Sequence, residues 1–104
     1  NFVSVNLKTG LKKNAWQSYN DHSVTLTRNV FGMQEPKFIM YYVNAAGARV
    51  PLAVTAQKVE NDDKTYRLRF KTPNAKGNFP VEIHYVIDGV ESGDYISTTM
   101  KVTK

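Results

Sequence analysis

Cysteine is absent from the 104-residue chain. Its absence excludes disulfide bonds, thiolate nucleophiles and cysteine-based metal sites. Histidine occurs only as His22 and His84, far apart in the sequence and without the spacing of a metal-binding motif. Glycine-rich phosphate loops, Gly-x-Ser-x-Gly elbows and His-Glu-x-x-His helices are also missing. We therefore expect no metal, no other cofactor and no enzymatic activity.

Long apolar runs are missing as well. The longest, at residues 38–43, is far shorter than the roughly 20 residues that cross a bilayer. The N-terminus also lacks the basic-then-apolar pattern of a signal peptide. We expect no membrane span. Because the chain starts at Asn1 it is either a processed mature chain or a domain excised from a larger protein. We favour the excised domain, whose partners would be the other domains of that protein.

The composition indicates one compact domain covering residues 1–104, since 41% of the residues are hydrophobic and no segment is of low complexity. Lys and Arg outnumber Asp and Glu by 14 to 9, and the formal net charge is +5. This charge attracts polyanions such as nucleic acid, anionic lipid headgroups or phosphate-rich wall polymers. The sign of the charge does not choose among them, and it is also compatible with a domain that binds nothing through its charge.

Two-residue alternation of apolar and polar side chains dominates the chain and predicts half-buried strands. Pro51 places its strand at a sheet edge, because proline cannot donate to the ladder. Breaks are expected at residues 31–36 and at the tight turn Asp88-Gly89, and residues 11–22 show no readable pattern. The expected strands lie at residues 3–7, 23–30, 37–43, 50–56, 65–71, 79–87 and 95–103.

These short, evenly spaced segments predict an all-β fold, an immunoglobulin-like antiparallel β-sandwich of about seven strands with Greek-key topology. An oligonucleotide-binding barrel is the rival architecture. It is disfavoured because the region where that barrel carries a helix is here the polar turn around Asn61 and Asp62. That turn, with Glu60 and Asp63, lacks the spacing and glycine of a calcium loop, and we interpret it as solvated. We interpret His84, on the outward side of its strand, as a solvated sheet-face residue.

Residues 65–71 carry the best candidate binding surface. Tyr66, Leu68 and Phe70 are expected to face inward, and the basic residues between them outward at intervals of about 7 Å, which is roughly the spacing of phosphates along a polyanion. The same pattern is also ordinary solvation that guards against edge aggregation. Aromatic rings that could stack on sugars or bases lie elsewhere in the sequence. The candidate ligand-binding residues are Arg67, Arg69, Lys71, Trp16 and Tyr19.

Three segments carry a resemblance to a known family: residues 65–70 (TYRLRF), 77–86 (GNFPVEIHYV) and 88–89 (DG). From Val24 onward the chain resembles the group B streptococcal Bsp-like repeat, an immunoglobulin-like module of Gram-positive surface proteins and wall hydrolases. Where that family often has Trp-Ser and Trp-Tyr pairs, this chain has Tyr42-Val43 and Ala53-Val54. The resemblance implies export and a cell-envelope setting, and it implies no particular binding residue.

The sequence thus favours a non-catalytic module of a bacterial cell-surface or wall-associated protein, located outside the cell. It would act as a spacer or bind an anionic wall polymer or glycan. An alternative is a carbohydrate-binding module of a glycoside-active enzyme, which needs a row of exposed aromatic residues. A nucleic-acid-binding β domain is disfavoured, because Arg67 and Arg69 are predicted to lie on the opposite face from Tyr66 and Phe70.

Overall fold

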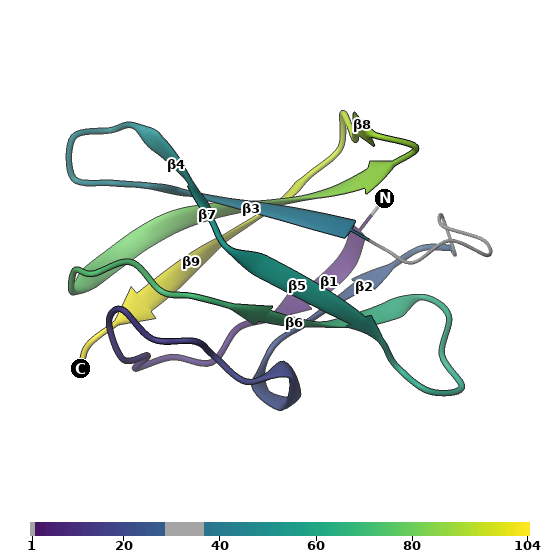
Figure 1. Cartoon of the computed structure of the whole chain (residues 1–104), viewed down its shortest axis with the longest axis horizontal. Coiled ribbons are helices and arrows are strands. Elements are labelled where there is room, and N and C mark those ends of the chain that lie inside the picture. The colour runs from purple at the N-terminus through teal and green to yellow at the C-terminus, as the bar shows by residue number, and fades with distance from the viewer. Residues whose placement is uncertain (1, 29–36) are drawn as a thin grey trace.

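The computed structural model describes residues 2–28 and 37–104, and these residues form strands joined by turns (Figure 1). No helix among them is long and apolar enough to cross a membrane. The elements are β1 (Phe2–Asn6), the 3₁₀ turn η1 (Tyr19–Asp21), β2 (Ser23–Leu26), β3 (Lys37–Val43), β4 (Arg49–Leu52), β5 (Val54–Lys58), β6 (Thr65–Phe70), β7 (Gly77–Ile87), β8 (Val90–Glu91) and β9 (Ile96–Val102).

The strands form two antiparallel sheets. One has the order β1-β2-β6-β5, and the other the order β4-β3-β7-β8, with β9 also paired to β7. The 11-residue β7 pairs with β3 along one edge and with both β9 and β8 along the other. The prediction of an all-β fold with antiparallel strands is confirmed, and the number of strands in the described residues is higher than the predicted seven.

The prediction of a single edge strand over residues 50–56 is wrong. The chain passes from one sheet to the other at Ala53, so that β4 pairs with β3 and β5 pairs with β6. Alternation cannot reveal this switch, because Val50, Leu52 and Val54 all stay half-buried across the crossing. The edge position of Pro51 is confirmed, since β4 is the outermost strand of its sheet.

The hairpin between β7 and β8 follows from local sequence, whereas the end of β2 does not. Asp88 and Gly89 both have positive φ, 51° and 79°, and join Ile87 to its partner Val90 in a two-residue hairpin, as predicted. Strand β2 ends at Leu26 rather than at the predicted Val30. The predicted continuation through residues 29 and 30 and the break at 31–36 lie outside the described residues.

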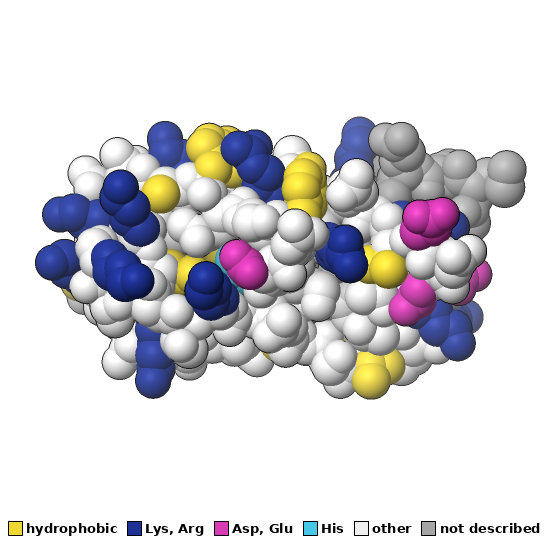
Figure 2. Space-filling view, turned by 90° about the horizontal axis from the view of Figure 1, so that it is seen from below, with side chains coloured by type: hydrophobic (Ala, Val, Ile, Leu, Met, Phe, Trp, Pro, Cys, Tyr) yellow, Lys and Arg dark blue, Asp and Glu magenta, His cyan; other side chains and the backbone are white. Residues whose placement is uncertain are grey.

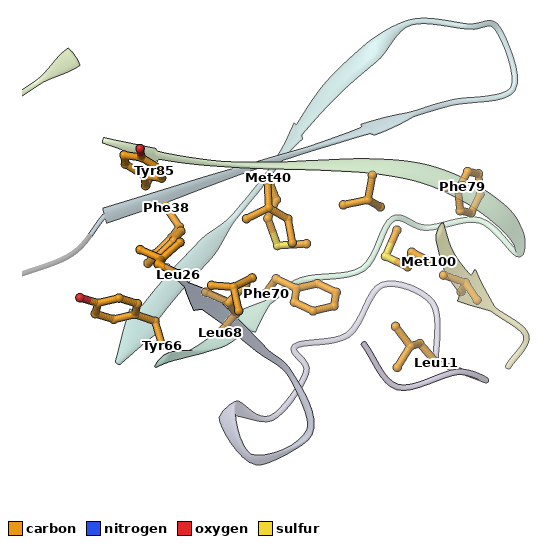
Figure 3. Packing of buried hydrophobic residues seen from close by; sticks show 14 residues of the cluster. Leu11, Leu26, Phe38, Met40, Tyr66, Leu68, Phe70, Phe79, Tyr85 and Met100 are labelled. Carbon is orange, nitrogen blue, oxygen red and sulfur yellow. The ribbon is translucent and has the colours of Figure 1, made fainter. Parts of the chain in front are cut away.

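The core lies between the two sheets and draws its side chains from alternate positions of the strands (Figure 3). On β6, Tyr66, Leu68 and Phe70 are fully buried, as the alternation predicts. The facing sheet contributes apolar residues of β3, β7 and β9. The buried hydrophobic residues are Leu11, Val24, Leu26, Phe38, Met40, Tyr66, Leu68, Phe70, Phe79, Val81, Ile83, Tyr85, Met100 and Val102.

Truncation of Leu68, whose side chain is completely buried in this core, tests the packing. We expect Leu68→Ala to lower the free energy of unfolding by about 2–5 kcal/mol, because it removes apolar contacts and leaves a cavity. Val3→Ala, at a side chain that is 61% exposed, is the control and should change it by less than about 0.5 kcal/mol. Urea unfolding measures both, and equal losses would contradict the assigned core.

Candidate functional site

The segment of residues 11–22, which the sequence left unassigned, connects the two sheets at one end of the molecule. Leu11 is buried; its amide donates to the carbonyl of Lys101 at 3.0 Å, and its carbonyl accepts from the amide of Thr103 at 3.0 Å. Five residues later Trp16 forms an antiparallel bridge with Lys71, just after β6. The segment therefore runs from β9 to β6 and places the indole of Trp16 beside the end of β6, the strand that carries Arg67 and Arg69.

Thr72 holds this segment in place. Its side chain is buried, and its hydroxyl donates to the carbonyl of Lys12 at 2.6 Å and accepts from the amide of Ala15 at 3.0 Å. The amide of Thr72 also donates to the carbonyl of Ala15 at 2.9 Å. Because buried polar groups must be paired, this hydroxyl sets the path of the backbone immediately before Trp16.

A shallow groove of about 530 Å³ opens where this segment meets the outer face of the β5–β6 pair. It brings together three of the five predicted binding residues, Trp16, Tyr19 and Arg69, which are distant in the sequence. Its further lining is polar, and nothing in the sequence pattern signalled it. The residues that line the groove are Trp16, Gln17, Ser18, Tyr19, Asn20, Gln57 and Arg69.

The groove residues are held by specific contacts. The guanidinium carbon of Arg69 lies 4.6 Å from the centroid of the Trp16 ring, a cation–π arrangement, while the indole stays 43% exposed. The hydroxyls of Tyr19 and Thr55 are 2.8 Å apart and hydrogen-bonded. The guanidinium of Arg67 reaches the side-chain oxygen of Asn20 at 3.5 Å. All five predicted binding residues thus lie in or beside this groove.

The cations of this surface have no acidic partners within the described part of the chain. The carboxylate near the groove, Asp21, pairs with Lys8 at 3.9 Å. Among residues 2–28 and 37–104, no carboxylate lies within ion-pair distance of Arg67, Arg69 or Lys71. These charges are therefore available to an anionic ligand.

His84, on the other sheet, is not the solvated residue that its outward parity predicted. Its side chain is buried, with the ring stacked on Tyr95 at 4.9 Å and edge-on to Tyr41 at 5.6 Å. Its two ring nitrogens lie 3.2 Å from a carboxylate oxygen of Glu82 and 3.3 Å from one of Glu91. Tyr41 on β3 and Tyr95 just before β9 cover the imidazole, and an alternation pattern within one strand cannot reveal such neighbours.

Arg49 completes the cluster around His84. It lies 4.3 Å from the centroid of the Tyr41 ring and 3.1 Å from the carboxylate of Glu82. The positive charge of Arg49 is thus paired with the carboxylate of Glu82 and is not free for an anionic ligand. In the part of the chain that the structure describes, no group of three or more His, Asp or Glu residues is arranged to hold a metal ion.

Comparisons with protein-family models, with curated proteins and with solved structures find no significant match to this chain. The resemblance to the Bsp-like repeat therefore stays a prediction. We select the groove beside Trp16 as the candidate site from its geometry alone. It brings together an exposed aromatic ring, side-chain amides and the cation of Arg69.

Removal of the Thr72 hydroxyl tests its role as an anchor. We expect Thr72→Val to lower the free energy of unfolding by about 1–3 kcal/mol, because the amide of Ala15 and the carbonyl of Lys12 lose their buried partner. The emission of Trp16 should also shift to the red as the segment loosens. Thr99→Val, at an exposed position, is the matched control, and identical behaviour of the two variants would contradict the anchor.

His22 gives the domain a specific pH dependence. Its ring is buried, Nδ1 donates to the carbonyl of Ser18 at 3.0 Å, and Nε2 has no hydrogen-bond partner among the residues that the structure describes. Burial lowers the pKa of His22 below the ordinary 6.5, against the opposing effects of the Ser18 hydrogen bond and the Asp21 charge. The unfolded chain therefore takes up a proton before the folded one does, and this destabilises the fold as the pH falls below 6.5.

We expect His22→Asn, which keeps a donor for Ser18, to remove this contribution. The wild-type free energy of unfolding should fall relative to that of the variant as the pH drops below about 6.5, and the difference should be constant above about pH 7.5. Urea unfolding across this range measures it. Parallel stability curves for the two proteins would show that His22 keeps its ordinary pKa in the fold.

Proposed function

We propose that this domain is a non-catalytic binding module that recognises an anionic glycan or wall polymer through the groove beside Trp16. The observation that carries the proposal is the contact between an exposed indole and the guanidinium of Arg69, which has no carboxylate partner among the described residues. An apolar ring and a free cation side by side match a ligand with an apolar sugar or polyol face next to a negative group.

The chemistry of the groove supports each part of such a ligand. The exposed part of the indole can stack on the C–H face of a sugar. Arg69 presents a planar fork of donors, which suits carboxylate or phosphate. The side-chain amides of Gln17, Asn20 and Gln57 line the same hollow and can bond hydroxyl groups. A single acidic saccharide or polyol phosphate unit satisfies all three.

The arrangement of the exposed aromatic residues favours an anionic ligand over the alternative of a neutral glycan bound on an aromatic row. Trp16 lies beside β6, whereas the other exposed aromatic side chain in the described part of the chain, Tyr95, stacks on His84 of β7 in the other sheet. The two rings therefore form no common platform, and binding must draw on the charges next to Trp16.

The proposal includes an immunoglobulin-like Greek-key sandwich. With the two-residue β8 set aside, the strand orders β1-β2-β6-β5 and β4-β3-β7-β9 correspond to the ABED and C′CFG sheets of that fold. It also includes a setting outside a bacterial cell, on a surface or wall-associated protein, which rests on the resemblance to the Bsp-like repeat.

Trp16 is the single tryptophan of the chain, so its fluorescence reports directly on the groove. We expect acidic monosaccharides or glycerol phosphate to change this emission in a saturable way that weakens with salt. Arg67→Glu combined with Arg69→Glu should weaken binding at least about tenfold, because it replaces attraction by repulsion.

The matched control is Lys37→Glu combined with Lys64→Glu, which makes the same change in net charge at exposed lysines outside the groove. It should bind almost as the wild type does. If both double variants lost the same amount of binding affinity, the effect would come from net charge, and the groove would not be the binding site. Salt-resistant binding of neutral glycans instead would favour the carbohydrate-binding alternative.

A further inference from the structure

Lysines from three distant parts of the sequence gather at the end of the molecule that holds the C-terminus. The amide of Lys13 donates to the carbonyl of Lys104 at 3.0 Å, and the amide of Leu11 to that of Lys101 at 3.0 Å. Lys71 follows β6 and pairs with Trp16 in the same segment. We call the exposed side chains of this end the lysine cluster: Lys12, Lys13, Lys71, Lys101 and Lys104.

The acidic residues lie mostly at the other end of the long axis, which extends 38 Å. The β5–β6 turn and the β7–β8 hairpin with its following turn are both far from the C-terminus in Figure 1. Figure 2 views the molecule from below relative to Figure 1. Most Lys and Arg side chains of that face gather toward one end, and most acidic side chains lie toward the opposite end. The acidic residues of those turns are Glu60, Asp62, Asp63, Asp88, Glu91 and Asp94.

Within the described residues, no ion pair neutralises any member of the lysine cluster. Like charges brought together in this way repel one another, and an anion that lies across them relieves the repulsion. The cluster adjoins the groove directly, since Lys71 is the bridge partner of Trp16 and the backbone of Lys12 is bonded to the anchor Thr72.

We propose that the lysine cluster and the groove form one continuous tract for a linear polyanion, whose repeat joins a sugar or polyol to a negative group. One repeat occupies the groove beside Trp16, and the following repeats place their charges on the lysines. The inference rests on the proposed function and goes beyond it, because it assigns a second contact surface, the lysine cluster, and requires a ligand long enough to occupy both the groove and this cluster.

The experiment compares polymers with their own monomers. The probes are poly(glycerol phosphate) against glycerol phosphate, and oligogalacturonate against galacturonic acid, so that the two arms distinguish phosphate from carboxylate ligands. Trp16 emission and the anisotropy of labelled polymer are followed between about 0.05 and 0.3 M salt. We expect one polymer to bind at least about tenfold more tightly than its monomer at low salt.

Lys12→Glu combined with Lys13→Glu tests the cluster itself. Both substitutions keep the backbone, and at these two positions it is the backbone that bonds to the rest of the fold, through the carbonyl of Lys12 and the amide of Lys13. In this variant the affinity for the polymer should fall most of the way to the affinity for the monomer, while the affinity for the monomer should stay unchanged. The slope of log affinity against log salt should fall by about one for each lysine contact removed. Lys37→Glu combined with Lys64→Glu is again the control of equal charge.

The outcomes separate the two proposals. Polymer and monomer binding with the same affinity and salt slope would overturn the tract and leave the groove intact. Polymer binding that survives Trp16→Ala but not the Lys12 and Lys13 reversals would overturn the groove. No binding of any probe would reject both. A single-stranded oligonucleotide of equal charge that binds as tightly as the best polymer would also overturn the assigned ligand class.

Discussion

Burial of one face of each strand against the shared core is the constraint on which the rest of this structure depends. On β6 the inward positions belong to Tyr66, Leu68 and Phe70, and a slip of one residue in register would move all of them to solvent. The basic side chains of that strand face outward for the same reason. The charged face of the candidate site is thus a direct consequence of how the core packs.

The site itself is completed by a segment without regular structure. Residues 11–18 carry few apolar side chains, yet they follow a defined path because Leu11 enters the core and the hydroxyl of Thr72 pairs with their backbone. A buried hydroxyl in this position costs free energy unless it is bonded, so it selects one backbone path. That path sets the indole of Trp16 beside Arg69 of β6.

The two outer faces of the molecule use charge in opposite ways. Around His84, Arg49 is paired with Glu82, the ring nitrogens of His84 lie next to the carboxylates of Glu82 and Glu91, and aromatic rings cover the imidazole, as expected of a structural network. Beside Trp16 and at the lysine end, the cations have no such partners among the described residues. The separation of charge along the long axis would also orient the domain as it approaches a polyanion.

The sequence by itself determined the all-β class, most strand positions, the hairpin at Asp88-Gly89 and the outward basic residues of β6, because alternation and turn chemistry act over neighbouring residues. It indicated Trp16 and Tyr19 only as aromatic rings that could stack on a ligand, without showing what lies next to them. Tertiary structure alone decided that these rings meet Arg69, that the chain changes sheets at Ala53, that His84 is buried and that distant lysines converge. Each of these depends on contacts between segments far apart in the chain, which no local pattern encodes.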